Sequence, residues 1–391
     1  MLRFAPSPTG ELSINSLRIA ILNYLVAQQQ QEHFLVRIED MNGKKNIEGK
    51  DSEIMMILEK FALKHNAVFH QSEHKNLYLT LALRLLKEKK AFICTCTTTS
   101  CIENCETLTS EDYDSLKASA KKFVIRLKNT SSLIMDTEGI PSYDFACATD
   151  DMMSGIKLVI RDEQYLENTA TQREIQKLLG YKEETSYVHI ASILNKEKLP
   201  TLQWLLEEGF IPDAILNYLL LLGNGAIAQE IFTLPQAIEW FDLESISKSS
   251  PTFDLDKLQY INAEHLKLMD NKRLSTLFGF ADEEIGKLAK VYLEEQCYTL
   301  KALESKIKPI FNPKDFSKKW GKEMKELSQI IFQAPYFEDF SSFKKHLKAQ
   351  SDLEDDKLLL ILRHLLTGTG DGPELSKIYP FIKSYILEVA S

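Results

Sequence analysis

The stretch that decides the fold of this chain is RFAPSPTGELSINSLRIAILNYL, which runs from Arg3 to Leu25. Its apolar start ends in residues 6–10, Pro-Ser-Pro-Thr-Gly, whose composition is typical of a turn. The apolar residues that follow recur at helical spacing, at Leu17, Ile21, Tyr24 and Leu25. A strand that turns directly into a helix leaves free backbone N–H groups at the positive end of the helix dipole. The stretch therefore predicts an anion-binding turn of the kind that holds phosphate.

The alternation of strand and helix continues after this stretch. HFLVRIED, residues 33–40, predicts a second strand, and residues 54–63 and 78–86 predict helices. Strands that alternate with helices are typical of a parallel α/β sheet. SYDFACATDD, residues 142–151, and GIKLVIRDEQYL, residues 155–166, have strand character, and we expect both to return to this sheet.

The remaining parts of the chain predict other kinds of structure. Residues 91–140 interrupt the α/β pattern, and KFVIRLK within them predicts a strand. From Phe210 onward the apolar residues lie almost throughout at helical spacing. We therefore expect an α/β domain with an insertion, followed by a helical region.

Composition and charge narrow the class of protein. The chain has 391 residues, 44% of them hydrophobic and 26% charged, which is ordinary for a soluble protein of two or three domains. The longest apolar run, 219–222, is far too short to cross a bilayer, and the N-terminus has no signal-peptide core. We therefore expect a cytoplasmic protein without a membrane partner. The net charge of −9 does not favour nucleic-acid binding, although a local basic face decides that question.

Four of the six cysteines lie within twelve residues, at Cys94, Cys96, Cys101 and Cys105. Such clustering in an intracellular chain suggests a metal site before it suggests disulfides. Four thiolates in a tetrahedral set select zinc. The alternative is four unrelated free thiols.

The first stretch resembles the start of the class I glutamyl- and glutaminyl-tRNA synthetases, whose first strand and turn read RFAPSPTGxL. The likeness continues in VRIED at 36–40, in the segment 141–172, and in EEGFIPDAILNYLLLLGN at 207–224. LLTGTGDGPEL at 365–375 is similar to part of the helical anticodon-binding domain, so the resemblance covers essentially the whole chain.

This resemblance implies a Rossmann-like α/β catalytic domain with a zinc-bearing insertion, followed by an all-α region. The implied boundaries are 1–90 and 141–209 for the two catalytic halves, 91–140 for the acceptor-end insertion, 210–270 for the stem-contact region, and 271–391 for the anticodon-binding domain. The four cysteines would hold a structural zinc ion, because four protein ligands leave no open position.

The resemblance also implies a substrate set. Family members activate L-glutamate with ATP and Mg²⁺ and transfer it to the terminal ribose of tRNA(Glu) or tRNA(Gln). The positions that match the glutamate pocket are Arg3, Ser7, Glu39, Tyr143 and Arg161. Guanidinium groups match carboxylates bidentately, although arginines at strand ends are otherwise often surface charges. The positions that match the ATP site are Gly10, Ser13, Ser16, Gln164, Tyr165 and Lys198. We expect a monomer.

The two ATP signatures depart from the family pattern. Where the family has His-Ile-Gly, this chain has Ser13-Ile14-Asn15, followed by Ser16. The second signature keeps Lys198 and Leu199, but Pro200 and Thr201 replace the following serine and lysine. Ser13, Asn15 and Lys198 thus stand at degenerate catalytic positions. Removing one transition-state donor costs roughly 10²–10³ in rate, so we expect impaired activation.

Three functions remain open at this point. The first is a glutamate–tRNA ligase, and the second is a synthetase-like paralogue that binds tRNA or a protein partner without chemistry. The third, glutamate transfer to a modified tRNA base, ranks last because relatives of that kind lack the helical C-terminal half. Lysines in predicted helices are candidates for phosphate contacts, although a solvated helix face is at least as plausible for each: Lys318, Lys319, Lys322, Lys325, Lys344, Lys345 and Lys348.

Overall fold

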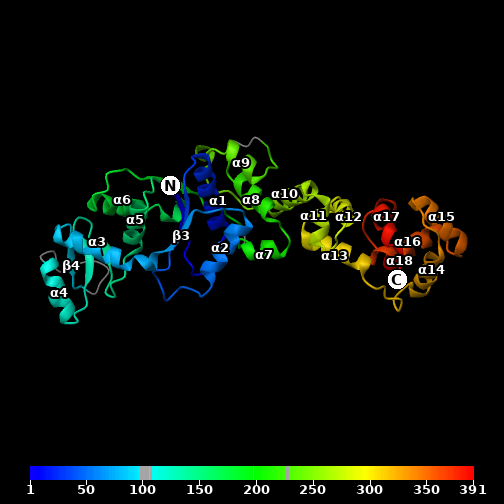
Figure 1. Cartoon of the computed structure of the whole chain (residues 1–391), viewed down its shortest axis with the longest axis horizontal. Helices are drawn as coiled ribbons and strands as arrows, with labels where there is room; N and C mark the ends of the chain where they lie inside the picture. Colours follow the sequence, from blue (N-terminus) through cyan, green and yellow to red (C-terminus); the bar gives the residue numbers. More distant parts are fainter. Residues whose placement is uncertain (97–104, 106–107, 197, 226–228) are drawn as a thin grey trace. The chain divides into compact units, whose positions relative to one another are not determined.

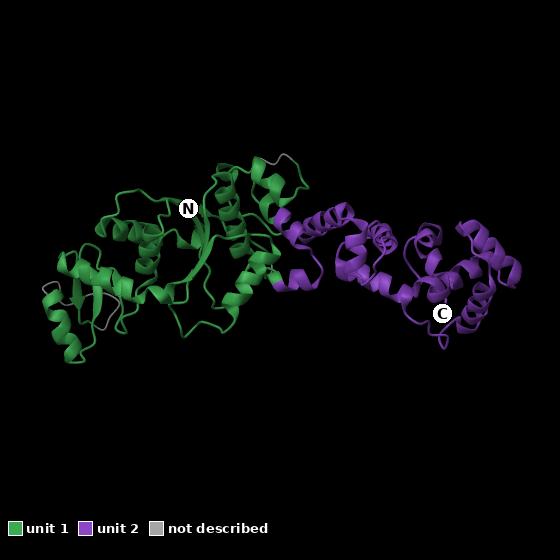
Figure 2. Cartoon of the chain, viewed as in Figure 1, with its two compact units in different colours: residues 1–202, 219–253 green, residues 203–218, 254–391 purple. Residues whose placement is uncertain are grey.

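The computed structural model describes residues 1–96, 105, 108–196, 198–225 and 229–391. The chain forms two compact units, which Figure 2 shows in green and purple. Unit 1 comprises residues 1–202 and 219–253, and unit 2 comprises residues 203–218 and 254–391.

Unit 1 is built around parallel strands, as the sequence predicts. β1 (Leu2–Phe4), β2 (Phe34–Ile38) and β3 (Ala67–His70) pair in parallel, and so do β7 (Leu158–Asp162) and β8 (Ser186–Ile190). These strands form two parallel sheets, in the orders β3-β2-β1 and β7-β8, and β7 lies beside β1. The chain therefore leaves β1 on one side and returns on the other, which makes the β1–β7 junction the topological switch point.

The first helix, α1 (Ile14–Gln29), follows β1 after the predicted turn (Figure 1). It is buried along most of its length and packs against β1 and β7. The side-chain amide of Asn23 donates to the carbonyl oxygen of Ile160 in β7 at 3.0 Å. This bond fixes the helix against the centre of the sheet.

The prediction of a strand at residues 142–151 is wrong, because this segment forms α5 (Tyr143–Met153). The Ser142 hydroxyl caps the helix by accepting a hydrogen bond from the Phe145 N–H at 3.3 Å. The buried face of α5 packs on α6 (Asn168–Leu178) and α3 (Lys75–Lys87). An N-cap and tertiary packing thus override a composition that resembles a strand.

The insertion contains the antiparallel strands β4 (Ala91–Cys94), β5 (Val124–Leu127) and β6 (Leu133–Met135), with α4 (Ser110–Ala118). The strand predicted at KFVIRLK is confirmed as β5. One apolar core joins these strands to α3 and α5, and its buried members include Tyr78, Leu85, Ile93, Ile125 and Phe145.

The other elements of unit 1 are α2 (Lys50–Lys60) and α9 (Leu234–Trp240). Unit 2 is built from helices (Figure 2). α7 (Leu202–Glu207) and α8 (Pro212–Leu221) each include a unit boundary. The helices that follow in unit 2 are α10 (Leu255–Leu268), α11 (Asn271–Leu277), α12 (Glu284–Leu293), α13 (Leu300–Phe311), α14 (Gly321–Gln333), α15 (Phe340–Gln350), α16 (Asp355–Thr367), α17 (Leu375–Ile382) and α18 (Ile386–Val389). Among the described residues, no helix is both long and apolar enough to traverse a membrane.

Candidate active site

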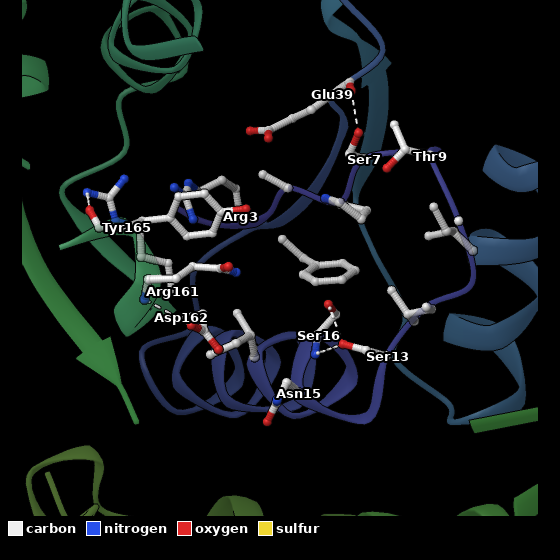
Figure 3. A pocket seen from close by; sticks show the side chains of 18 of the residues that line it. Arg3, Ser7, Thr9, Ser13, Asn15, Ser16, Glu39, Arg161, Asp162 and Tyr165 are labelled. Carbon is white, nitrogen blue, oxygen red and sulfur yellow. Dashed lines mark hydrogen bonds between the residues drawn. The ribbon is translucent and has the colours of Figure 1, made fainter. Parts of the chain in front are cut away.

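A cavity of about 460 Å³ lies at the carboxyl ends of β1 and β7 (Figure 3). Its wall is formed by the turn after β1, the first turn of α1, the end of β7 and the 3₁₀ turn η3 (Glu163–Tyr165). Open α/β sheets bind ligands at this place, outside the carboxyl ends of strands at the switch point.

Every predicted glutamate and ATP residue except Lys198 lines this one cavity. Lys198 is exposed and does not belong to the lining that the structure describes, and its carbonyl oxygen accepts from the Asn195 side chain at 3.2 Å. The cavity therefore combines residues that are as far apart in sequence as Arg3 and Tyr165.

Ser13 is the N-cap of α1. Its hydroxyl oxygen accepts a hydrogen bond from the Ser16 N–H at 3.0 Å and lies 3.0 Å from the Ser16 hydroxyl oxygen. Figure 3 shows both contacts at the edge of the cavity. The capped N–H is one of the orphan donors at a helix start, so the cap uses a group that would otherwise face an anion.

Asn15 does not direct its side chain toward the Ser13–Ser16 contact. Its Oδ1 accepts a hydrogen bond from the Ile193 N–H at 2.9 Å, across 178 positions of sequence. One turn later Arg18 donates to the carbonyl oxygen of Ala191 at 3.2 Å. Two residues of α1 thus hold the segment that follows β8.

A buried ionic cluster supports the other end of the cavity. Asp151 Oδ1 accepts from Arg3 Nε at 3.1 Å and from Arg37 Nη1 at 2.5 Å. Arg37 also donates through Nη2 to Glu39 Oε1 at 3.2 Å. Although burial opposes ionisation, the two arginines hold the pKa of Asp151 below its usual value. Burial raises the pKa of Glu39, against the effect of Arg37.

Arg161 is engaged by protein groups on nearly all of its guanidinium. It donates to Gln172 Oε1 at 2.8 Å, to Thr169 Oγ1 at 2.9 Å, to the Tyr165 carbonyl oxygen at 3.0 Å and to His189 Nε2 at 3.3 Å. These bonds fix the guanidinium beside the cavity, and they compete with the bidentate carboxylate contact that the sequence predicts.

The remaining predicted residues lie close together on the wall. The Ser7 hydroxyl donates to the Glu39 carbonyl oxygen at 3.1 Å (Figure 3), and the Tyr143 and Tyr165 rings stack with centroids 5.5 Å apart. Gln164 and Tyr165 belong to η3, which Asp162 caps through the Gln164 N–H. Gly10 lies in the turn before α1, with open space where a Cβ would stand.

Sequence reasoning missed Arg37, Asp151 and Ser192. The Ser192 hydroxyl donates to both Asp162 oxygens, at 3.1 and 2.9 Å, and so joins the ends of β7 and β8. The sequence around Arg37 and Asp151 could have indicated a buried ion pair. A charged residue within an apolar strand or beside apolar helix positions needs a buried partner.

The cysteine cluster lies apart from the cavity, at the end of β4. The sulfur atoms of Cys94, Cys96 and Cys105 lie within 4.8 Å of one another, and those of Cys96 and Cys105 are 3.7 Å apart. Cys101, the fourth predicted ligand, lies outside the described residues. Three converging thiols fit the donor set of a tetrahedral zinc site.

The parallel strands, the capped helix after β1 and the cavity at the switch point define a doubly wound α/β fold, the class that binds ligands at the carboxyl ends of its strands. The family model for the catalytic domain of class I tRNA synthetases (E and Q) matches residues 1–103 and 124–260. Glutamate–tRNA ligase 2 of Sulfurovum sp. is 48% identical and that of Sulfurimonas denitrificans 40% identical, with both chains fully covered in each comparison. The chain therefore belongs to the glutamate–tRNA ligase family.

A solved structure shares the fold. It is a glutamate tRNA ligase from Elizabethkingia meningosepticum in complex with its amino acid, with a TM-score of 0.80 and 23% identity. The match covers 99% of this chain and 97% of that chain.

Proposed function

We propose that the chain is an ATP-dependent glutamate–tRNA ligase, which activates L-glutamate and transfers it to the terminal ribose of tRNA(Glu) or tRNA(Gln). The observation that carries this proposal is the single cavity that gathers the predicted glutamate and ATP positions, Lys198 excepted. Full-length similarity to glutamate–tRNA ligases supports the same function.

The chemistry asks for positioning rather than for a base. A glutamate carboxylate is already ionised at neutral pH, so it attacks the α-phosphorus of ATP without losing a proton, while the bond from that phosphorus to the leaving pyrophosphate breaks. Arg3, held by Asp151, supplies positive charge for a substrate carboxylate, and Glu39 supplies an acceptor for the ammonium group. The first turn of α1 receives the phosphates, and Mg²⁺ would neutralise part of their charge.

The phosphate apparatus of this ligase is weakened. The Ser13 hydroxyl is occupied as a helix cap, and Lys198 does not line the cavity that the structure describes. If the effects of these two changes on the activation barrier are additive, together they lower the rate of glutamate activation by about 10⁴–10⁶-fold. We therefore propose slow activation of glutamate.

A second candidate is a synthetase-like paralogue that binds tRNA or a protein partner without chemistry. The occupied Ser13 hydroxyl and the position of Lys198 favour it. Such a protein keeps the RNA-binding surface of the family but does not form the adenylate.

The test is ATP-dependent charging of radiolabelled glutamate onto purified tRNA(Glu) and tRNA(Gln), with tRNA binding measured in parallel. Charging of either tRNA supports the ligase and identifies its substrate. Intact tRNA binding without charging overturns the ligase and supports the paralogue.

The proposal extends to the other regions of the chain. Cys94, Cys96 and Cys105, together with Cys101, would hold a structural zinc ion in the acceptor-end insertion at 91–140. Residues 210–270 would contact the tRNA stem, and residues 271–391 the anticodon. We also propose that the ligase acts in the cytoplasm as a monomer.

A further inference from the structure

We propose that the Cys147 thiol positions the Glu39 carboxylate, so that one oxygen of this carboxylate stays free to bind an ammonium group in the cavity. Cys147 is a positioning residue, since it does not belong to the lining that the structure describes. The inference rests on the proposed function, because L-glutamate is the ligand that brings the ammonium group.

The two carboxylate oxygens of Glu39 have different surroundings. Oε1 accepts a hydrogen bond from the Cys147 thiol, with Sγ and Oε1 3.2 Å apart, and another from Arg37 Nη2 at 3.2 Å. Oε2 has no hydrogen-bond or ion-pair partner in the part of the chain that the structure describes. Both donors therefore act on the same oxygen.

Burial indicates which oxygen faces the cavity. Arg37 and Cys147 are each 1% exposed, so Oε1 is held on the buried side of the carboxylate. The Glu39 side chain lines the cavity and is 10% exposed, and Figure 3 shows it extending toward the side on which Arg3 lies. The free oxygen, Oε2, is therefore the acceptor that Glu39 offers to a ligand.

Two donors from different elements fix the plane of the carboxylate. Rotation about the last bond of a glutamate side chain has only broad preferences, so a single donor sets this plane loosely. Arg37 belongs to β2, two residues before Glu39, whereas Cys147 belongs to α5. The thiol thus ties the carboxylate to a second element of unit 1.

The thiol donates only while it keeps its proton. Burial raises the pKa of Cys147 well above its usual value, and the negative charge of Glu39 acts in the same direction. Burial also raises the pKa of Glu39, whereas Arg37 and the hydrogen bond from Cys147 lower it. Removing the thiol should therefore raise the pKa of Glu39 further, so that ammonium binding is lost at a higher pH.

The other titratable and charged groups around Glu39 keep their charge states between pH 5 and pH 8. Burial raises the pKa values of Tyr143 and Tyr165, so both stay neutral. Although burial opposes ionisation, the arginines hold the pKa of Asp151 below its usual value, and arginines stay charged in proteins. The complete set is Arg3 of β1, Arg37 of β2, Tyr143, Cys147 and Asp151 of α5, and Tyr165 of η3.

The experiment measures ligand binding by calorimetry on the full-length chain between pH 5 and pH 8. The proteins are the natural chain, Cys147→Ala, Cys147→Val and Cys147→Ser, with Cys297→Ala as a matched control. Cys297 is a buried thiol in unit 2, so its replacement reports the cost of losing a buried sulfur outside the cavity. The ligands are L-glutamate and glutarate, which has both carboxylates but no ammonium group.

At pH 7.5 we expect Cys147→Ala and Cys147→Val to bind glutamate about two- to tenfold more weakly, the range of one net hydrogen bond. Their glutamate affinity should also fall at a higher pH than that of the natural chain. Cys147→Ser keeps a donor and should stay close to the natural chain. Glutarate affinity should not change in any variant, and Cys297→Ala should match the natural chain for both ligands.

If Cys147→Ala does not fold, Cys147→Val, which fills the space without a donor, carries the comparison. Equal losses of glutamate and glutarate affinity overturn the inference, because the thiol would then maintain the shape of the cavity rather than the Glu39 carboxylate. Unchanged glutamate affinity in the alanine or valine variant also overturns it.

The charging assay tests the ligase separately. The expected order of glutamate affinities without charging supports the inference and overturns the ligase. Charging with equal glutamate affinities in all variants does the reverse. Absence of glutamate binding by the natural chain overturns both.

Discussion

At the scale of single residues, one carboxylate oxygen of Asp151 joins two arginines that have almost no exposed surface. Replacing Asp151 with asparagine leaves Arg3 and Arg37 without this counter-charge in a buried place. Removing one partner of a buried ion pair costs about 3–5 kcal/mol. We expect Asp151→Asn to lower the free energy of unfolding by this amount, measured by urea denaturation.

The control is Glu138→Gln, which breaks an exposed ion pair with Lys44, whose atoms are 3.5 Å apart. Exposed pairs contribute less than about 1 kcal/mol. Equal stability of the Asp151 and Glu138 variants would show that the buried cluster does not stabilise the fold.

Ser13 gives a prediction about whether the histidine of the family signature would restore a high charging rate. Restoring histidine at this position removes the N-cap of α1 and leaves Pro200 and Thr201 in the second signature. We expect Ser13→His to raise the charging rate by less than tenfold, measured with labelled glutamate. Its control is Ser13→Ala, which removes the cap without adding a donor and should cost about 1 kcal/mol of stability. A hundredfold gain for Ser13→His would mean that the loop after Lys198 is not limiting.

The family resemblance predicted residues that line the cavity, but it could not predict what each side chain touches. The hydrogen bond between Asn15 and Ile193 joins residues 178 positions apart in the sequence. The Arg161 guanidinium donates hydrogen bonds to residues of η3, α6 and β8. Such contacts depend on the tertiary fold, so they leave no local pattern in the sequence.

At the scale of elements, the strand–turn–helix of residues 2–29 was predictable because its hydrophobic spacing and its turn residues agree. α5 was not predictable in the same way. Its stretch of apolar and small residues is compatible with either a strand or a helix, and the Ser142 cap and packing on α6 decide between them.

The helices of unit 2 contain a pH-sensitive contact. His265 in α10 is buried, and its Nε2 lies 2.8 Å from Asn217 Oδ1 in α8. Burial lowers the pKa of His265 below its ordinary value of 6.5, although Asp213 opposes the shift. A lowered folded-state pKa stabilises the fold above pH 6.5, and this stability is lost as the pH falls, because the unfolded chain takes up the proton.

We therefore expect the urea midpoint of unfolding to decrease when the pH is lowered from 7.5 to 5.5. The His265→Gln variant should show a smaller decrease over the same pH range. For one titrating group, the free energy of unfolding changes by at most about 1.4 kcal/mol per pH unit. The matched control is His33→Gln at an exposed position, which should keep the slope of the natural chain. An unchanged slope in His265→Gln would contradict the assignment.

The β4–β6 sheet gives a prediction about metal. Elemental analysis of protein purified in metal-free buffer should find about one zinc ion per chain, since the thiols converge at the end of β4. Cys105→Ser should lose the ion, whereas Cys297→Ser, in unit 2, should keep it. Absence of zinc from the natural chain would refute the site.

At the scale of the whole molecule, the net charge of −9 coexists with lysines on the helices of unit 2. Lys318 Nζ lies 3.5 Å from Asp315 Oδ2, and Lys319 Nζ lies 5.0 Å from the centroid of the Trp320 ring. If these two lysines contact tRNA phosphates, tRNA affinity falls as the salt concentration rises. A variant that carries both Lys318→Ala and Lys319→Ala should then show a weaker dependence of tRNA affinity on salt. The same dependence in the variant and the natural chain, measured by filter binding, would exclude these two lysines.

The order of α/β and helical regions was predictable from hydrophobic spacing, whereas the compact units were not. Residues 203–218 belong to unit 2 and residues 219–253 return to unit 1, and no change of composition marks either crossing. The predicted functional boundaries at 209 and 270 therefore stay predictions.

During synthesis, residues 203–218 leave the ribosome before residues 219–253, which complete unit 1. A gene truncated after residue 253 would therefore leave the early segment without its partners. The Ile211 amide would lose Asn262, and the Gly209 carbonyl would lose the Leu300 amide. A nascent chain must therefore hold this segment without these partners until the later helices emerge, and transiently exposed apolar surface of this kind favours aggregation.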